Sequence, residues 1–238
     1  MTNPLLQKWS TPYEMPPFER IHAAHFPEAF NQALASHQAE IQNIANQKQA
    51  PSFQNTLLAL EASGELLNQT SAIFFNLSAS HTSPEIQAIE REISPKLAAH
   101  SAAMFLNAAL FERIDKLHAE RASLGLDSES IRLIERYHLD FVRAGARLKD
   151  KDRQAFAEYS EKLASCFTQF SQNVLADEAA FCLVLTEADQ LKGLPDFVKS
   201  AALQLAKERG LTQANAHAFT LSRSSITPFM TFSERRDL

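Results

Sequence analysis

Apolar residues recur at three- and four-residue steps through most of the first 178 residues, the spacing of one face of an α-helix. The pattern is strongest in a helix that the sequence predicts to open at Asp150 or Asp152. Its apolar positions are Phe156, Tyr159, Leu163, Phe167, Phe170 and Val174. Because these six side chains share one face over about five turns, we expect this helix to be packed in the core.

Capping residues and prolines mark the starts of other helices. A side-chain oxygen before the first turn can accept a free backbone N–H, and proline suits the first helical position. One helix of this kind is expected to continue past Gly64 with one face buried. In chain order the start signals are Pro27, Ser52 or Asn55, Ser83 with Pro84, and Asp127.

The N-terminal 26 residues differ from the helical part that follows. They contain four prolines and lack helical periodicity, so we expect residues 1–26 to form an extended arm on a helical body of residues 27–178. The prolines are Pro4, Pro12, Pro16 and Pro17.

The chain changes character again after residue 178. Two short apolar runs, 181–185 and 217–221, read as strands on either side of a helix from Pro195 to Arg209. We therefore expect residues 179–238 to form a strand–helix–strand appendage. Thr227 with Pro228 predicts a further helix, truncated at the chain end and without a capping glycine, which favours a chain cut from a longer protein. The predicted fold class is all-α, a multi-helix array with a small pair of β-strands near the C-terminal end.

Composition and charge exclude several classes of protein. Five glycines in 238 residues are too few for a sandwich, a barrel or a Rossmann fold. A net charge of −5 gives no basic surface for nucleic acid, and no apolar run is long enough to span a membrane. Cys166 and Cys182 lie among apolar neighbours, which favours small buried thiols rather than a disulfide or a metal pair. With no signal peptide apparent, we expect a cytoplasmic protein with neither nucleic acid nor membrane as a partner.

The histidines do not form a recognisable metal site. None of the eight is followed by glutamate, so the zinc-binding HExxH pattern does not occur. His22, His25 and Glu28 are spaced by three residues but straddle a helix start, which favours capping and surface roles. Glu135 and His138 match the ExxH spacing of di-iron bundles, but a hydrogen-bonded histidine beside the core is the favoured interpretation of His138.

Motifs for nucleophilic or phosphate chemistry do not occur in the sequence either. There is no GxSxG, no P-loop and no GxGxxG, and the serines at 222–225 read as a polar loop. The residues alone therefore predict no catalytic residue and no metal ligand in this chain, and they do not indicate which residues bind substrate.

Several stretches, in the same order along the chain, carry a family resemblance. They are Asn3–Leu6, Pro12–Tyr13, Pro16–Phe18, Pro51–Thr56, Ala59–Leu67, Phe74–Leu77, Leu124–Leu133 and Phe141–Leu148. Together they resemble the N-terminal half of the thimet-oligopeptidase-like zinc metallopeptidases. The resemblance is closest to the bacterial peptidyl-dipeptidase (dipeptidyl carboxypeptidase) branch, rather than to oligopeptidase A.

This resemblance implies a function for the chain as part of a larger enzyme. The family is helical, with a deep channel whose wall is formed by the N-terminal helices, and its zinc site lies in the C-terminal half. The chain would be a non-catalytic half that restricts and positions short peptides, without a cofactor of its own. Its partner would be the missing catalytic half, which holds zinc and removes dipeptides from peptide C-termini. The isolated chain would expose an apolar patch that includes Phe229, Met230 and Phe232.

Two other interpretations remain open at this point. The first is a stand-alone helical interaction module that binds a partner helix or a peptide in a groove. The second is a metal-binding bundle that uses Glu135 and His138.

Overall fold

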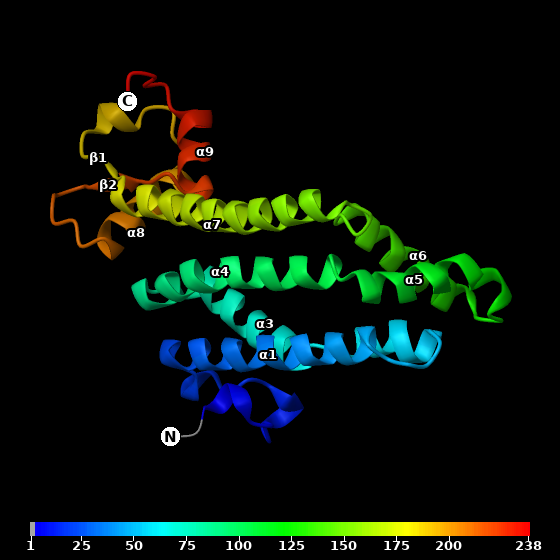
Figure 1. Ribbon diagram of the computed structural model, residues 1–238. Helices are drawn as coiled ribbons and strands as arrows, with labels where there is room; N and C mark the ends of the chain where they lie inside the picture. Colours follow the sequence, from blue (N-terminus) through cyan, green and yellow to red (C-terminus); the bar gives the residue numbers. More distant parts are fainter. Residues whose placement is uncertain (1–2) are drawn as a thin grey trace. The chain divides into compact units, whose positions relative to one another are not determined.

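The computed structural model describes residues 3–238, which divide into a first unit ending at Thr168 and a second unit from Gln169 to Leu238 (Figure 1). The expected fold class is confirmed, since the described chain is mostly helical with one small antiparallel sheet. No helix in this part of the chain is both long and apolar enough to cross a membrane.

The first unit consists of helices joined by short turns. Its helices are α1 (Phe26–Ala45), a π-helical turn (Phe53–Leu58) that continues as α2 (Ala59–Glu61), α3 (Glu65–Ser80), α4 (Pro84–Phe105), α5 (Ala108–Glu120) and α6 (Ser128–Arg143). The long helix α7 (Asp150–Ala180) begins in this unit and ends in the second one.

The predicted capping residues form the expected hydrogen bonds. The Ser83 hydroxyl oxygen accepts the backbone N–H of Ile86 at 3.3 Å, and the Asp127 carboxylate accepts that of Ser130 at 2.8 Å. At the start of the π-helical turn, the Ser52 hydroxyl accepts the backbone N–H of Asn55 at 3.1 Å, and the side-chain oxygen Oδ1 of Asn55 accepts the backbone N–H of Ser52 at 2.8 Å. Each bond satisfies an N–H that has no partner inside its helix.

Two apolar cores lie along α1. The first half of α1 packs with α3 and α4, and the second half packs with α5, α6 and the π-helical turn. Phe26, Phe30 and Phe74 are fully buried in the first core, where the Phe74 ring meets the other two edge-on.

Residues 3–25 are not extended throughout. They form short 3-10 turns at Pro4–Leu6, Pro12–Glu14, Phe18–Arg20 and Ala23–His25. The segment is attached to the first core by buried Leu5 and Ile21, with Trp9 packed beside them. The Trp9 ring N–H also donates to the Pro4 carbonyl at 2.7 Å, so its polar edge keeps a partner.

The expected continuous helix through Gly64 is interrupted. Gly64 has a φ of +74°, which is a left-handed conformation, and the helices on either side of it are separate. Its backbone N–H donates to the Glu40 carboxylate on α1 at 2.7 Å. A left-handed residue cannot continue a right-handed helix, and glycine adopts this conformation at little cost.

The second unit holds the sheet and two helices. It contains β1 (Leu183–Leu185), α8 (Asp196–Glu208), β2 (His217–Phe219) and α9 (Arg223–Phe232). The strands pair antiparallel with Val184 opposite Ala218, and the buried face of α8 packs against them. The two strands and the helix between them therefore lie where the sequence predicted.

The last helix differs from the expectation at both ends. α9 begins at Arg223, one turn before Thr227 and Pro228, because the Ser222 carbonyl already accepts the N–H of Ser225. It also ends, at Phe232, instead of being cut off by the end of the chain.

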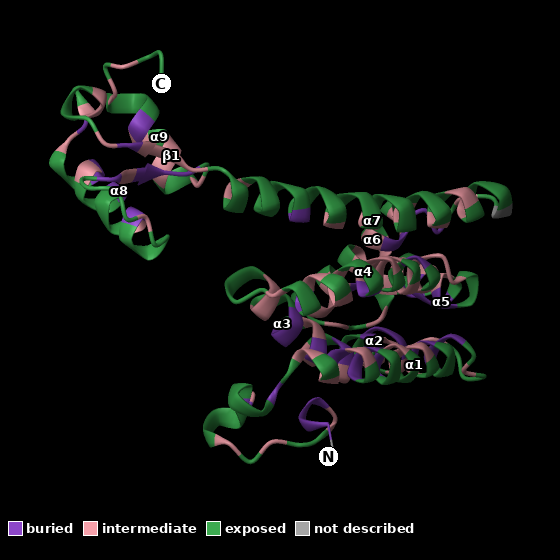
Figure 2. Cartoon of the chain, turned by 90° about the vertical axis from the view of Figure 1, so that its left-hand side faces the viewer, coloured by how far each residue is buried: buried purple, intermediate pink, exposed green. Residues whose placement is uncertain are grey.

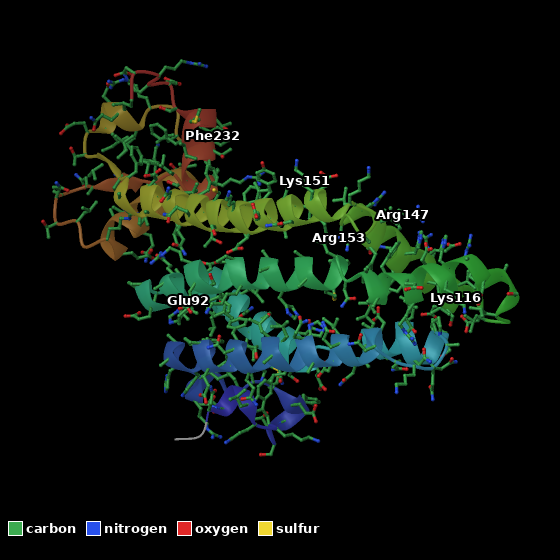
Figure 3. The ribbon with its side chains drawn as sticks, viewed as in Figure 1. Glu92, Lys116, Arg147, Lys151, Arg153 and Phe232 are labelled. Carbon is green, nitrogen blue, oxygen red and sulfur yellow. The ribbon has the colours of Figure 1, made fainter. Side chains whose placement is uncertain are left out.

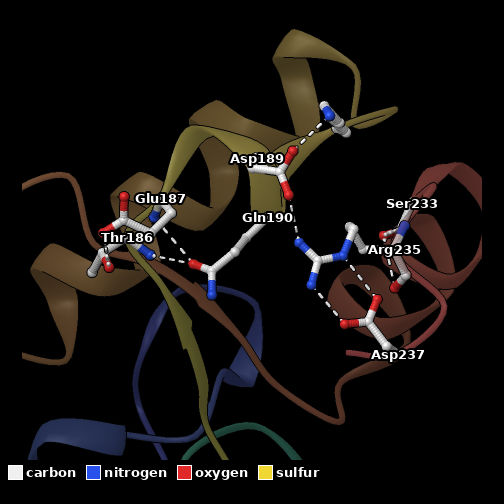
Figure 4. Close-up of polar contacts among 8 residues, drawn as sticks. Thr186, Glu187, Asp189, Gln190, Ser233, Arg235 and Asp237 are labelled. Carbon is white, nitrogen blue, oxygen red and sulfur yellow. Dashed lines mark hydrogen bonds and ion pairs between the residues drawn. The ribbon is translucent and has the colours of Figure 1, made fainter.

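An ion-pair network holds the segment after α9 against the loop that follows β1 (Figure 4). The Arg235 guanidinium donates to Asp189 at 2.7 Å and to Asp237 at 2.6 Å, and the N–H of Glu234 donates to the Lys192 carbonyl. Gly193 lies under this segment, where a Cβ would come within 2.3 Å of the Phe232 carbonyl oxygen. The close approach requires glycine at this position.

Candidate interaction surface

Most residues of α7 are exposed (Figure 2). They include its large apolar side chains, which contradicts the expectation of a core helix. Tyr159 is 65% exposed, and Phe167 and Phe170 are each 66% exposed. We call this surface the α7 apolar face. Its members are Phe156, Tyr159, Leu163, Phe167, Phe170 and Val174.

A different face of α7 is the less exposed one. It carries small or polar side chains and lies about a third of a turn around the helix from the apolar face. Its members are Arg153, Ala157, Ser160, Ala164, Thr168 and Gln172. The Arg153 side chain lies at the start of the helix (Figure 3), where its guanidinium donates to the Leu148 carbonyl at 3.0 Å. Periodicity identified the bulky face correctly, but that face is exposed, and the less exposed face of α7 is a different one.

The stretch of α7 that carries the apolar face also has few charged residues. Charged residues make up 21% of the sequence, yet none lies between residues 163 and 176. Cys166, which we expected to be buried, is exposed on this stretch, and Cys182 is partly buried; both are free thiols. A helical surface without charges that presents aromatic rings to water is typical of an interaction site.

Two histidines from different helices form a hydrogen-bonded pair in the first unit. His100 Nε2 on α4 lies 2.9 Å from His37 Nδ1 on α1, and the other ring nitrogen of His37 is 3.2 Å from the Ser63 hydroxyl. Partial burial lowers the pKa of both rings below 6.5. At His37 the nearby negative charge of Glu40 raises the pKa and offsets part of this effect. One nitrogen of the pair must donate and the other must accept, so the hydrogen bond is lost when both rings are protonated, and burial disfavours the charged form of either ring.

This histidine pair is expected to make the first unit less stable in acid. Since folding lowers both pKa values, the unfolded chain binds more protons below pH 6.5, and stability falls as the pH drops through this region. Urea unfolding at about pH 7.5 and about pH 5.5 measures the loss of unfolding free energy between the two pH values. This loss should be smaller in the double variant His37→Gln, His100→Gln than in the wild type. The exposed His81 provides the control, since His81→Gln should keep the wild-type pH dependence. If the double variant lost as much unfolding free energy as the wild type, the histidine pair would not be the cause of the acid sensitivity.

His138 is a hydrogen-bonded histidine beside the core, as predicted. Its Nε2 lies 2.9 Å from the Asp115 carboxylate, and its ring stacks on His118 with centroids 3.8 Å apart. Arg147 also donates to Asp115, at 3.2 Å. Glu135 has a different partner, because its carboxylate accepts from Arg121 at 3.2 Å. The sequence contained no local signal for Asp115, which is 23 residues from His138.

The other histidine candidates have capping and structural roles. The His22 backbone N–H donates to His25 Nδ1 at 3.0 Å, and Glu28 accepts from the Asn3 side chain at 3.0 Å. Among the side chains that the structure describes, no three from histidine, cysteine, aspartate or glutamate gather in a geometry that could hold a metal ion. The described residues therefore do not fit a zinc centre, which needs at least three protein ligands.

Two clefts of about 360 Å³ each lie in the second unit. The serines at 222–225, which we interpreted as a loop, open α9 and line the first cleft. The Ser222 hydroxyl lies 3.3 Å from that of Ser224, and the lining residues include no histidine to act as a base. The first cleft therefore shows none of the partners that activate a serine nucleophile.

The second cleft is mainly apolar and includes part of the expected patch. Met230 and Phe232 are exposed, but Phe229 is buried with its ring 4.7 Å from that of Phe219. Phe229 was therefore wrongly assigned to the exposed patch, because α9 turns this side chain towards the sheet. The cleft also contains Arg235 and Arg236.

Comparison with known proteins identifies relatives along nearly the whole chain. The dipeptidyl carboxypeptidase of Salmonella typhimurium is 41% identical over 212 residues, and that of Escherichia coli is 40% identical over 209. These alignments cover 89% and 88% of the chain but 31% of each relative. Oligopeptidase A of Escherichia coli is 24% identical over the whole chain and 34% of its own length. No family model matches.

These matches confirm the resemblance to the thimet-oligopeptidase-like peptidases. Identity is higher with the two dipeptidyl carboxypeptidases than with the oligopeptidase A, in agreement with the sequence analysis. The chain spans about a third of the length of the curated relatives it matches, not the half that we expected.

Proposed function

We propose that this chain is the N-terminal, non-catalytic part of a cytoplasmic zinc metallopeptidase that removes dipeptides from the C-termini of short peptides. The observation that supports this proposal most directly is the 41% identity to a dipeptidyl carboxypeptidase, in an alignment that covers only 31% of that relative. The described residues offer no ligand set for zinc, so we assign metal binding and water activation to the rest of the parent polypeptide.

The role proposed for the chain itself is to form a channel wall that restricts and positions peptides. Its helices are fixed by two buried cores along α1, which makes the first unit suited to a rigid wall. A rigid wall excludes folded proteins, limits the access of water and reduces the number of poses available to a bound peptide. The partners in this proposal are the catalytic part of the polypeptide and the peptide substrates.

This proposal is tested by comparing the 238-residue chain with the polypeptide encoded by its complete gene. We expect the chain alone to bind no stoichiometric zinc and to release no dipeptide from a short peptide with a free C-terminus. The complete polypeptide should do both. Zinc analysis and mass spectrometry of the products give the readouts. Stoichiometric zinc together with peptidase activity in the chain alone would overturn the proposal.

The exposed α7 apolar face also favours a second candidate function, a stand-alone module that binds a partner helix or peptide. The coding sequence after Leu238 distinguishes the two. A stop codon at that point supports the module, whereas a downstream HExxH supports the peptidase.

A further inference from the structure

We propose that the α7 apolar face is the docking surface for an apolar helix face supplied by the same polypeptide outside this chain. The identity of the occupant rests on the proposed function, but the existence of a docking surface rests on α7 alone. The surface is distinct from the patch on α9 that the sequence suggested.

The size and continuity of the apolar face indicate an interface. Its six side chains span 19 residues from Phe156 to Val174, and the 18 steps between them make about 27 Å along the helix axis. Single exposed apolar side chains are common on protein surfaces, but an aligned row of aromatic and aliphatic groups is characteristic of interaction sites. A partner helix of about five turns would cover the row.

The surroundings of this face specify the chemistry of its partner. The charged residues between Phe156 and Val174 are Glu158, Glu161 and Lys162. Helical spacing places the two glutamates away from the row, whereas the Lys162 ammonium lies 5.9 Å from the centroid of the Tyr159 ring, so the charge-free part of the row begins at Leu163. On the other flank lies the exposed Ser171, whose small side chain allows close approach of a second helix. The partner is therefore an uncharged helix face with apolar side chains at three- and four-residue steps.

A peptide substrate fits this surface poorly. Peptides of varied sequence are held through their backbone groups and their terminal carboxylate, which needs hydrogen-bond donors or a cation. The face itself is formed by hydrocarbon side chains with one tyrosine, and no charged residue lies from 163 to 176. The relatives, by contrast, are about three times as long as the aligned segment, so they contain ample further polypeptide to cover α7.

Cysteine labelling can test this docking directly. In a Cys166→Ser, Cys182→Ser background, the thiol introduced by Phe167→Cys should react rapidly with a maleimide in the 238-residue chain. In the complete polypeptide it should react at least about ten-fold more slowly, because the partner helix covers it. Glu161→Cys, on the charged side of α7, is the matched control and should react at similar rates in both proteins. Equal rates for Phe167→Cys in the two proteins would overturn the inference.

A stability measurement provides an independent test. Phe167→Ala with Phe170→Ala should leave the melting temperature of the 238-residue chain nearly unchanged, because both side chains are already exposed to water. The same pair should lower the melting temperature of the complete polypeptide by about 5 °C or more. If the alanine pair prevents folding of the complete polypeptide, Phe167→Leu with Phe170→Leu should restore folding, because it keeps the face apolar. An equal change of melting temperature in the two proteins would contradict docking.

The remaining outcomes separate this inference from the proposed function. Protection of Phe167→Cys that increases with the concentration of the 238-residue chain, without protection in the complete polypeptide, would identify a second copy as the occupant and overturn the inference. A complete polypeptide that is a zinc peptidase but leaves this thiol reactive would refute the docking surface alone. Protection without peptidase activity would refute the proposed function while supporting the docking surface.

Discussion

The Phe74→Ala variant is expected to lose about 3–5 kcal/mol of unfolding free energy in the first unit. Phe74 on α3 is fully buried, and its ring centroid lies 5.0 Å from that of Phe26 and 5.4 Å from that of Phe30. Alanine would remove the central ring of this cluster and leave a cavity between α1 and α3. The surrounding helices cannot close such a gap completely, because Phe26 and Phe30 are fixed on one rigid helix.

The measurement can use Trp9, the single tryptophan of the chain. Trp9 packs against the same core, so its fluorescence during urea unfolding reports on this part of the first unit. The neighbouring Phe75 is 38% exposed and provides the matched control. Phe75→Ala removes the same ring from the same helix and should cost less than about 1.5 kcal/mol. Equal losses in the two variants would show that the cluster around Phe74 is not tightly packed.

The features that the sequence predicted correctly are those with local causes. Ser83 and Asp127 cap the helices they precede, because a side-chain oxygen reaches an N–H only three residues away. The strands β1 and β2 were recognisable from short apolar runs, and α8 from the segment between them. Each of these assignments depends only on residues close together in the sequence.

The errors involve interactions between residues distant in sequence or outside the chain. Periodicity shows that a face of α7 must be covered, but it does not show which polypeptide covers it. The expectation of burial was wrong because the bulky side chains of α7 are exposed and its less exposed face lies about a third of a turn away. The break at Gly64 depends on Glu40 of another helix, 24 residues earlier.

The polar pairs illustrate the same limit. His37 and His100 are 63 residues apart, and His138 finds Asp115 on a neighbouring helix. A single sequence carries no signal that joins such positions, since either residue alone is unremarkable on its own helix. The sequence could therefore identify His138 as hydrogen-bonded without naming its partner, and it missed the pair of His37 with His100 altogether.

The Arg113→Met variant is expected to lose about 3 kcal/mol or more of unfolding free energy, the second large effect. Arg113 on α5 is buried, and its guanidinium donates to the carbonyl oxygens of Gln47 and Gln49 at 3.2 and 3.1 Å. It also donates to the side-chain oxygens of Asn55 at 2.8 Å and Thr56 at 3.1 Å. One side chain thus ties the segment after α1 and the π-helical turn to α5. Methionine would fill much of the space but remove the guanidinium donor from all four acceptors, of which Asn55 Oδ1 would keep the Ser52 N–H.

The exposed Arg132 is the control for the loss of a positive charge. Its side chain is 74% exposed and forms a 3.5 Å ion pair with Glu135, so Arg132→Met should cost less than about 0.5 kcal/mol. Urea unfolding followed by circular dichroism compares the two variants. Arg113→Lys adds a second test, because one ammonium group cannot reach all four acceptors and should recover only part of the loss. If lysine restored full stability, the charge at this position would matter and the fork of hydrogen bonds would not.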